Sequence, residues 1–372
     1  VRAPSVDVRT IGAGGGSIAF VAELTKALRV GPESAGAVPG PAAYMKGGEL
    51  PTVCDANVVL GYLPSDAQLG GAMAINRDAA MAAVQKVADS LGIDVMEAAE
   101  GIIRIANEAM FGALRLVSVE QGYDPRDFSL VGFGGAGPLH ANALGRLVNS
   151  FPVIVPPGPG VLCAYGDATT QLQDEAARSY GSLASDISQT QLAADLEALK
   201  DRASQALLAD GIAASQLKVT YQADVRYAGQ AFQISVDFDA ESLSSKGIAV
   251  ITDVFDDEHE KLFTFKLGDG HEIVMIRAVV SSQGQTLEIR KQPDSTLTLA
   301  ECAIHETRIY FEGAWYDATI YERYKLHAAL TVPGPAIVME MDSTTLILPG
   351  YQARTDHIGN LLIEPVASSQ GA

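Results

Sequence analysis

The chain has 372 residues, of which 48% are hydrophobic and 19% are charged, and its formal net charge is −19. This composition excludes a disordered chain, and the length allows two or three domains with a large core. The negative charge argues against nonspecific nucleic-acid binding, which needs a basic surface. No apolar run reaches the ~18 residues of a membrane helix, so we expect neither a nucleic acid nor a membrane as partner.

Cysteine usage indicates the compartment. Cys54, Cys163 and Cys302 lie far apart in the chain and do not have the spacing of metal ligands. This pattern is typical of a reducing compartment, so we predict a cytoplasmic protein without disulfide bonds or a zinc site. All three cysteines are interpreted as small buried side chains. We assign no metal-ligating residue.

A glycine-rich loop near the N-terminus is the first candidate binding element. Gly12, Gly14, Gly15 and Gly16 come just before Ser17, and apolar residues flank the loop on both sides. So many glycines allow the backbone to wrap around an anion, and a buried loop of this kind must find partners for its N–H groups. The alternative interpretation is a flexible hairpin tip.

The next two segments are candidate loops and caps. Residues 30–41 are rich in glycine and proline, which excludes a helix or a central strand and predicts an ordered loop. In residues 52–61, either Asp55 or Asn57 suits the N-cap of a helix. The functional alternative is that Asp55 orients a metal-bound water or a ligand hydroxyl group.

Two helices are predicted after these loops, over residues 77–90 and 94–121. The second helix carries a wide apolar stripe with a period of 3.6 residues. Its small side chains allow close packing against a sheet. Gly122 and the Asp-Pro pair that follows it mark the end of the helix. A helix that leads into a strand and a glycine turn is typical of an α/β protein.

The stretch that follows is the strongest motif in the chain. Residues 128–131 have the character of a short strand, residues 132–137 contain four glycines, and residues 142–148 have the character of a helix. Such a turn lets the backbone approach a phosphate or a nucleoside, because glycine lacks a Cβ and the start of a helix offers unpaired N–H groups. A tight structural connection is the alternative. His140, beside this turn, is either structural or a ligand-binding or catalytic group.

The second half of the chain changes in period. The elements predicted there are a strand over 151–156, a helix within 161–180 that leaves the domain, a helix over 190–209, an antiparallel pair over 219–227 and 232–238, a helix over 250–263 and a strand over 272–282. Asp224 and Arg226 are interpreted as an ordinary surface pair. The acidic run that ends at His259 is interpreted as a solvated helix face.

From about residue 295 the chain is rich in β-strands. Residues 307–311 and 314–321 predict a hairpin whose two-residue turn is Glu312 and Gly313. Trp315 is interpreted as a core residue. Further strands are predicted over residues 336–340 and 344–348. These changes in character divide the chain into domains over residues 1–185, 186–290 and 291–372.

Several motifs, in this order, resemble the hydantoinase A / 5-oxoprolinase family, which also includes a subunit of acetone carboxylase. The residues that carry the resemblance are 10–19, 31–41, 55–57 and 132–141, together with 224–230 and 334–338 toward the C-terminus. The resemblance covers essentially the whole chain.

Members of this family resemble the actin-like ATPases, in which two α/β lobes close on ATP. The resemblance implies an α/β fold in which an actin-like (ribonuclease-H-like) lobe is followed by an α+β domain and a β-rich C-terminal domain. It implies that Gly134, Gly135 and Gly137 form the turn on the adenosine side. It also implies that the loop from Gly12 to Ser17 lies in or near the nucleotide cleft.

The resemblance also implies a reaction and its cofactors. ATP would phosphorylate the oxygen of a cyclic amide such as a hydantoin or 5-oxoproline, and water could then attack the adjacent carbon. Mg²⁺ would offset the phosphate charge, which a chain this acidic needs. Asp55 and His140 are the candidate catalytic residues.

Two departures from the family pattern matter. Phosphate loops of the Asp-Gly-Gly-Thr type normally precede the region that matches Val1, and members of the family are much longer. We therefore expect the C-terminal half of a subunit that works with an N-terminal half carrying the phosphate loops, a B-type hydantoinase subunit and a small-molecule substrate. The alternatives are a subunit of an ATP-dependent ketone carboxylase and a non-catalytic half that binds a partner.

Overall fold

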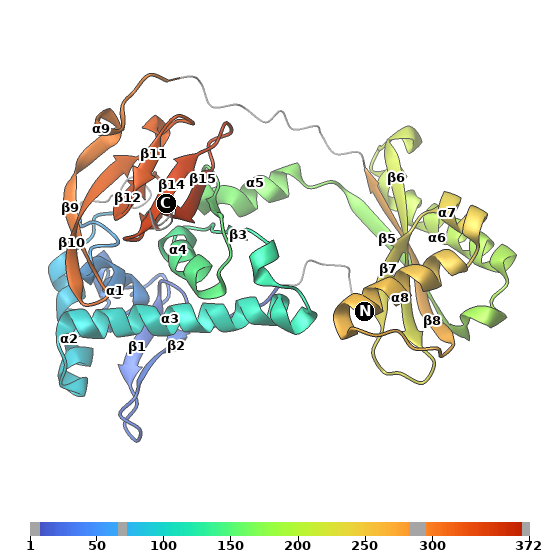
Figure 1. Ribbon diagram of the computed structural model, residues 1–372, viewed down its shortest axis with the longest axis horizontal. Helices are drawn as coiled ribbons and strands as arrows, with labels where there is room; N and C mark the ends of the chain where they lie inside the picture. Colours follow the sequence, from blue (N-terminus) through green and yellow to red (C-terminus); the bar gives the residue numbers. More distant parts are fainter. Residues whose placement is uncertain (1–7, 66–72, 283–294, 367–372) are drawn as a thin grey trace, which may run out of the picture. The chain divides into compact units, whose positions relative to one another are not determined.

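The computed structural model describes residues 8–65, 73–282 and 295–366 (Figure 1). The chain forms two compact units, the first from Val1–Tyr165 with Ile289–Ala372 and the second from Gly166–Glu288. The β-rich C-terminal stretch, set apart above as a domain of its own, lies in the first unit. No helix in the described ranges has the length and apolar character needed to cross a membrane.

The first unit contains three sheets and most of the helices. Its helices are α1 (Val53–Val59), α2 (Arg77–Leu91), α3 (Val95–Val117), α4 (Gly137–Val148) and α9 (Leu299–Cys302), and α5 (Leu162–Thr169) runs across the boundary into the second unit. The predicted helices over 77–90 and 94–121 are thus confirmed as α2 and α3. An asparagine and an aspartate supply their N-caps, since Asn76 accepts a hydrogen bond from Ala79 N and Asp94 accepts one from Met96 N.

The strands of the first unit form sheets of two, four and five strands. The two-stranded sheet is β1 (Ser17–Val21) with β2 (Leu28–Ser34). The four-stranded sheet has the order β13 (Thr344–Ile347), β12 (Ala336–Met339), β10 (Ala314–Glu322) and β9 (Ala303–Phe311). The five-stranded sheet has the order β11 (Thr331–Pro333), β14 (Tyr351–Thr355), β15 (Leu361–Pro365), β4 (Val153–Val155) and β3 (Leu130–Val131). Because β15 pairs with β4, the C-terminal strands complete a sheet begun before residue 165.

Two strand predictions have different outcomes. The hairpin with the Glu312 and Gly313 turn is confirmed, and both turn residues have the positive φ of a type I′ turn, 48° and 78°. The loop predicted over residues 30–41 is wrong at its start, which belongs to β2. Proline is allowed there because β2 is an edge strand of a two-stranded sheet.

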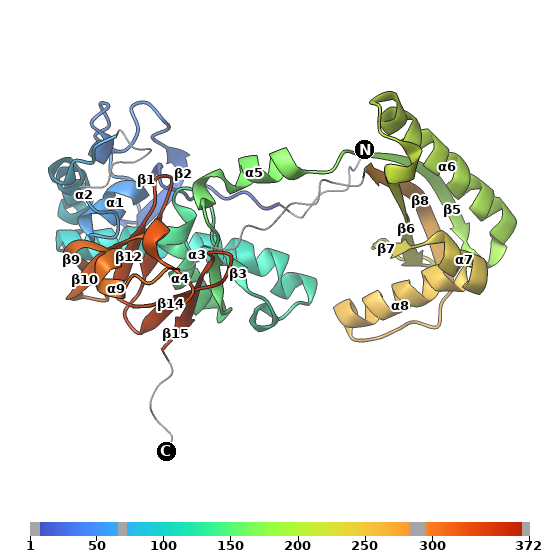
Figure 2. The same ribbon diagram turned by 90° about the horizontal axis from the view of Figure 1, so that it is seen from above.

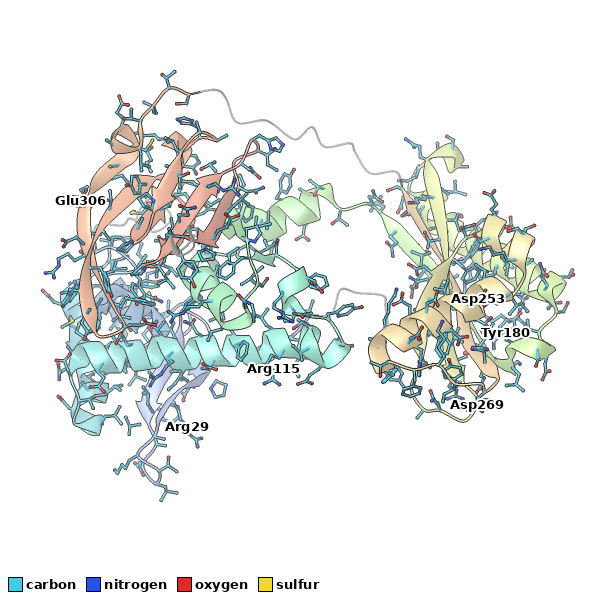
Figure 3. The ribbon with its side chains drawn as sticks, in the orientation of Figure 1. Arg29, Arg115, Tyr180, Asp253, Asp269 and Glu306 are labelled. Atoms are coloured by element: carbon cyan, nitrogen blue, oxygen red, sulfur yellow. The ribbon has the colours of Figure 1, made fainter. Side chains whose placement is uncertain are left out.

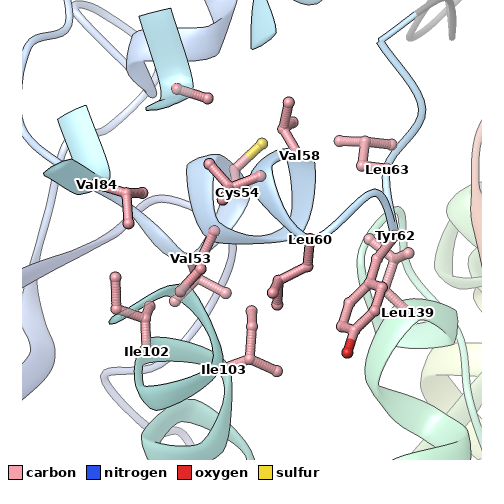
Figure 4. Close-up of a cluster of buried hydrophobic side chains, with 14 of the residues drawn as sticks. Val53, Cys54, Val58, Leu60, Tyr62, Leu63, Val84, Ile102, Ile103 and Leu139 are labelled. Atoms are coloured by element: carbon pink, nitrogen blue, oxygen red, sulfur yellow. The ribbon is translucent and has the colours of Figure 1, made fainter. Parts of the chain in front are cut away.

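Helix α1 lies at the centre of the core of the first unit. All of its residues are buried. Figure 4 shows Val53 at its start and Leu60 just after its end facing Ile102 and Ile103 of α3, with Val84 of α2 in the same cluster. The apolar stripe predicted for α3 therefore packs mainly on other helices.

Helix α4 lies between α3 and the sheets of the first unit (Figures 1 and 2). Glycine permits this close approach at two positions. A Cβ on Gly145 would lie 2.3 Å from a methyl carbon of Val153 in β4, and a Cβ on Gly132 would lie 2.6 Å from the Cβ of Ala141. The predicted strand, glycine turn and helix are confirmed, although the helix begins at Gly137, inside the turn.

The second unit is an antiparallel sheet with helices on its apolar face. Its strands have the order β5 (Gln173–Leu183), β8 (His271–Ser282), β6 (Leu217–Tyr227) and β7 (Ile234–Phe238), and its helices are α6 (Gln189–Ala209), α7 (Ala240–Lys246) and α8 (Ala249–Phe263). The helices, strands and antiparallel pair predicted from residue 190 to 282 are confirmed. The helix predicted within 161–180 is wrong beyond Thr169, because β5 pairs with β8.

The surface pair predicted between Asp224 and Arg226 is wrong. Asp224 is 3% exposed and accepts a hydrogen bond from Arg277 at 2.6 Å, whereas Arg226 binds Glu272 at 2.9 Å. Arg226 lies directly across the ladder from Glu272 of β8, and Asp224 pairs with its diagonal neighbour on the same strand, Arg277, which is opposite Gln222. Both ion pairs therefore connect β6 to β8.

Three other burial predictions are also wrong. His259, placed on a solvated face, is 2% exposed because it follows Phe255 by one turn of α8 on the buried side. Trp315 is 40% exposed, since it lies beside Tyr310 on the outer side of the hairpin. Cys163 is exposed, whereas the other two cysteines are buried as predicted.

We expect Ile102→Ala to lower the free energy of unfolding of the first unit by about 2–5 kcal/mol, because the side chain is fully buried and its removal leaves a cavity. Ile304→Ala is the matched control, since Ile304 is 49% exposed. We expect the control to cost less than about 1 kcal/mol. Urea unfolding followed by circular dichroism measures both changes. Equal losses would show that α3 does not pack as described.

Candidate functional site

A cavity of about 430 Å³ lies within the first unit, between the two glycine stretches. It is lined by Gly15, Tyr44, Cys54, Asn57, Leu63, Met73, Gly135, Ala136, Leu139, Met341, Asp342, Ser343 and Thr344. Its volume is in the range of small-molecule sites, which is roughly 300–1,000 Å³. The structure thus brings together two motifs that are more than a hundred residues apart in the chain.

The glycine loop before β1 is closed by its own serine. Ser17 is buried, and its hydroxyl oxygen accepts a hydrogen bond from Gly14 N at 2.9 Å. The carbonyl oxygen of Gly15 accepts a hydrogen bond from Cys54 N at 2.8 Å, which fixes the loop on the start of α1. Gly15 lines the cavity, whereas Gly12 packs against Pro32, where a Cβ would be 2.5 Å from the proline Cβ.

The turn before α4 forms the opposite wall. Gly134 has a φ of 84°, and its N–H donates a hydrogen bond to the carbonyl oxygen of Pro159 at 2.7 Å. Ala136 is the N-cap residue of α4, and no side chain of the described ranges caps this helix. The start of α4 therefore presents backbone N–H groups near the cavity, with Gly135 and Ala136 in its wall.

The third wall is the turn between β12 and β13, which the sequence analysis did not select. Ser343 donates from its hydroxyl toward the carbonyl oxygens of Gly134 and Gly135, at 3.4 and 3.3 Å. Asp342 packs closely on Gly160. A Cβ added to Gly160 would lie 2.4 Å from the carbonyl oxygen of Asp342. In the sequence, this wall could have been recognised from two polar residues, Asp342 and Ser343, between two apolar strands.

Two buried acceptor atoms of the lining residues lack a protein partner. Asn57 is 2% exposed, and its side-chain nitrogen donates to the carbonyl oxygen of Val53 at 3.1 Å. Its Oδ1, like Oδ2 of Asp342, is buried without a hydrogen-bond partner among the described residues. Unsatisfied buried acceptors are costly. A donor group of a ligand that reached either atom would satisfy it.

Asp55, predicted as a catalytic or capping residue, accepts four hydrogen bonds. They come from the backbone N–H groups of Ala42, Ala43 and Thr52, at 3.3, 2.8 and 2.9 Å, and from the Thr52 hydroxyl at 2.7 Å. The N-cap of α1 is Thr52, so the N-cap prediction for Asp55 and Asn57 is wrong, and Asp55 completes a capping box from the third helical position. Burial raises the pKa of the Asp55 carboxyl group, and the hydrogen bonds oppose this shift.

Asp55 acts on the cavity through its neighbours. It holds the turn before Tyr44, whose hydroxyl oxygen lies 3.4 Å from the sulfur of Cys54 in the cavity wall. Burial raises the pKa of the Cys54 thiol to about 12. Cys54 therefore remains protonated at neutral pH and is a poor nucleophile. The catalytic role of Asp55 itself stays a prediction.

His140, the other candidate catalytic residue, lies on α4 next to α3. It is 2% exposed, and its Nδ1 lies 2.7 Å from Oδ1 of Asn107. Burial lowers the pKa of His140 to about 4, so the ring is neutral at pH 7. Its Nε2 is buried without a hydrogen-bond partner among the described residues. The cavity lining does not include His140, and its catalytic role stays a prediction.

The charges of the lining residues limit what the cavity can hold. Among the lining residues that the structure describes, Asp342 carries the single carboxylate, and there is no lysine or arginine. A polyphosphate would find no cation there, whereas a neutral group with hydrogen-bond donors would match the free acceptors. The described residues contain no group of three or more histidine, cysteine, aspartate or glutamate side chains suited to a metal ion.

Comparison with known families agrees with this combination of fold and glycine turns. Residues 1–176 match the hydantoinase/oxoprolinase family, and residues 184–361 match the hydantoinase/oxoprolinase C-terminal domain. Proteins named as an ATP-dependent caprolactamase and as 5-oxoprolinase are among the relatives of this chain. The chain belongs to the hydantoinase/oxoprolinase family.

Individual relatives refine this placement. Caprolactamase subunit alpha of Pseudomonas jessenii is 34% identical over 366 residues, which are 96% of this chain and 52% of the relative. 5-Oxoprolinase 1 of Arabidopsis thaliana is 29% identical, over 99% of this chain and 30% of the relative. The chain thus spans about half or less of the length of these relatives.

Two solved structures have a similar fold. The crystal structure of the ATP-dependent caprolactamase from Pseudomonas jessenii matches with a TM-score of 0.85 at 33% identity, over 96% of this chain and 53% of that one. The nucleotide-free structure of acetone carboxylase matches with a TM-score of 0.74 at 25% identity, over 96% of this chain and 52% of that one. The mixed α/β architecture with several sheets is therefore that of caprolactamase.

The buried state of His140 predicts a dependence of stability on pH. Its folded pKa of about 4 lies below the unfolded value of about 6.5. Its contribution to stability is therefore full above pH ~6.5 and is lost as the pH falls toward 4. Between pH 7 and pH 5, His140 alone lowers the free energy of unfolding by about 2 kcal/mol.

Urea unfolding at pH 7 and pH 5 measures this loss in the wild type and in two variants. Between pH 7 and pH 5, we expect the free energy of unfolding of His140→Gln to fall by about 2 kcal/mol less than that of the wild type. His357→Gln is the matched control, because His357 is exposed, and it should behave as the wild type does. An unchanged pH dependence in His140→Gln would contradict the buried, neutral assignment.

Proposed function

We propose that this chain forms the nucleoside-binding part of an ATP-dependent enzyme that hydrolyses a cyclic amide. The observation that carries the proposal is the cavity in which Gly15 of the first glycine loop faces Gly135 of the second. Its relatives include enzymes named as ATP-dependent, and caprolactamase and 5-oxoprolinase are named for cyclic amides. Within this proposal the first unit is one lobe of an actin-like pair.

The chemistry of the cavity favours the nucleoside over the phosphates. Oδ1 of Asn57 and Oδ2 of Asp342 are buried acceptors, which suit the hydroxyl groups of a ribose or the amino group of a base. Leu63, Met73 and Leu139 supply apolar surface for a planar ring. The described lining residues include no cation, which supports phosphate binding by a different segment.

The phosphates and Mg²⁺ therefore belong, in this proposal, to an N-terminal half with the phosphate loops. Asp342, the one carboxylate among the described lining residues, could contribute an oxygen to Mg²⁺, which usually keeps several water ligands and binds phosphate oxygens. ATP would supply a phosphoryl group that turns the amide oxygen into a better leaving group, so that water can attack the adjacent carbon. Asp55 and His140 act here as positioning residues for α1 and α4.

Similarity favours amide hydrolysis over ketone carboxylation. The match to the caprolactamase structure has the higher TM-score and identity, 0.85 and 33% against 0.74 and 25% for acetone carboxylase. Both kinds of relative are named as subunits, caprolactamase subunit alpha and acetone carboxylase beta subunit. We therefore propose that the chain works with a second subunit of the B type.

The nucleoside assignment predicts that the chain alone binds adenosine about as well as ATP, because the described lining residues offer no cation to the phosphates. Calorimetric titration with each ligand, in the absence of a partner chain, measures both affinities. We expect Asp342→Asn to weaken adenosine binding about tenfold, since a buried acceptor for a ligand hydroxyl is lost. Asp317→Asn is the matched control, because that carboxylate is 92% exposed.

Binding of ATP by the chain alone that is much tighter than binding of adenosine would overturn this assignment. Equal weakening of adenosine binding by Asp342→Asn and Asp317→Asn would also overturn it.

The reaction itself predicts turnover by the reconstituted enzyme. With an N-terminal half and a B-type subunit added, we expect ATP-dependent ring opening of caprolactam or 5-oxoproline, measured as release of amino acid and of ADP. A matched reaction with acetone and bicarbonate tests the carboxylase alternative. Ketone consumption that depends on bicarbonate, without lactam opening, would replace the proposed function.

A further inference from the structure

A second cavity, of about 370 Å³, lies in the first unit beside the C-terminal half of α4. Leu139 in the first half of α4 lines the glycine cavity, whereas Ala143, Arg146 and Leu147 in its second half line this one. Of the residues that the structure describes, none lines both cavities. This second cavity is therefore not part of the nucleoside site proposed above.

The floor of the second cavity is apolar and firmly packed. Leu60, Tyr62, Ile103 and Leu348 line it, and each of these side chains is at most 8% exposed. Figure 4 shows Leu60, Tyr62 and Ile103 in the main hydrophobic cluster of the unit, with the Tyr62 ring beside Leu139. Burial and the carboxylates of Glu100 and Glu312 raise the pKa of Tyr62, so its hydroxyl group remains a donor.

The rim of the cavity carries both signs of charge. Glu100, Arg104 and Glu108 follow one another at intervals of four along α3, which places them on one face of the helix. Arg146 of α4 and Glu312 of the β9–β10 turn complete the rim. Two guanidinium groups and three carboxylates thus surround an apolar floor.

The ion pair between Arg146 and Glu312 on the rim can be replaced by contacts with a ligand. Arg146 and Glu312 lie 2.7 Å apart, with side chains that are 48% and 59% exposed. A pair this exposed contributes about 0–1 kcal/mol, so its groups can turn to a ligand at little cost. Arg146 also stands over the ring of Phe311, 6.0 Å from its centroid, and Gly313 N donates to Glu100 at 3.4 Å. The turn is therefore held on both helices while its charges stay accessible.

We infer that this second cavity binds a small zwitterion with an apolar body, of the ω-amino acid type. The methylene chain would lie on the floor, the carboxylate would pair with Arg146 or Arg104, and the ammonium group would pair with Glu312 or Glu108. A ligand with only a negative charge is repelled by the three carboxylates on the rim. A ligand with only a positive charge leaves the two guanidinium groups without a partner in the ligand. A neutral apolar molecule engages neither sign of charge.

The same ligand class connects the cavity to the reaction. Addition of water across a lactam C–N bond breaks that bond and leaves one amine and one carboxylic acid on the same carbon chain, which is a zwitterion at neutral pH. The second cavity would then hold the ring-opened product. This last step, unlike the binding site itself, rests on the proposed function.

Calorimetric titration of the chain with 6-aminohexanoate, without nucleotide or partner, tests the site. We expect hexanoate and hexylamine, which each keep one charged end, to bind about tenfold more weakly than the zwitterion. Arg146→Gln should weaken binding of 6-aminohexanoate about tenfold, and Arg146→Lys should retain part of it. Ala143→Trp, which fills the cavity, should abolish binding.

Arg115→Gln is the matched control for the arginine variants, because Arg115 lies on α3 (Figure 3) and is not one of the lining residues. Thermal unfolding of each variant shows whether it is folded. Equal binding of all three ligands, or binding that Ala143→Trp leaves intact in a folded protein, would overturn the proposed site.

The outcomes for the two proposals can be separated. If 6-aminohexanoate binds in the cavity but the reconstituted enzyme opens no lactam, the site stands and the product assignment fails. If lactam is opened but the zwitterion does not bind, the site proposal fails and the proposed function stands.

Discussion

The buried carboxylate of Asp55 is the interaction on which much of the first unit depends. A buried charge is tolerated only when donors surround it, and here four hydrogen bonds come from the turn at residues 42–43 and from Thr52. They fix the start of α1, and with it Cys54 and Asn57 in the cavity wall. Since α1 lies at the centre of the core, the same carboxylate connects the packing of α2 and α3 to the shape of the glycine cavity.

Helix α4 lines both of the cavities for which we propose ligands. Its first half faces the glycine loop and its second half faces the charged rim formed by α3 and the β9–β10 turn. The helix can lie this close to the sheet because Gly145 leaves room for Val153. Between the halves lies His140, neutral and bound to Asn107 of α3. A buried neutral group fixes the helix without adding charge to either cavity.

The second unit is stabilised in a different way. Its helices cover one face of a four-stranded antiparallel sheet, and the other face carries the paired charges of Asp224 with Arg277 and of Arg226 with Glu272. Such pairs satisfy groups that lie between neighbouring strands and keep the register of β6 on β8.

The sequence by itself determined the elements with a clear period or a clear turn. These include α2 and α3, the strand, glycine turn and helix around Gly134, and the hairpin at Gly313, because such signals depend on neighbouring residues. Only the tertiary structure decided which distant residues meet: that Gly15 faces Gly135, that Asp342 closes their cavity, and that Asp224 pairs with Arg277 instead of Arg226. Burial of His259 and exposure of Trp315 were decided in the same way. The physical reason is that contacts across sheets and between packed helices depend on three-dimensional proximity, which the local pattern of a single chain does not encode.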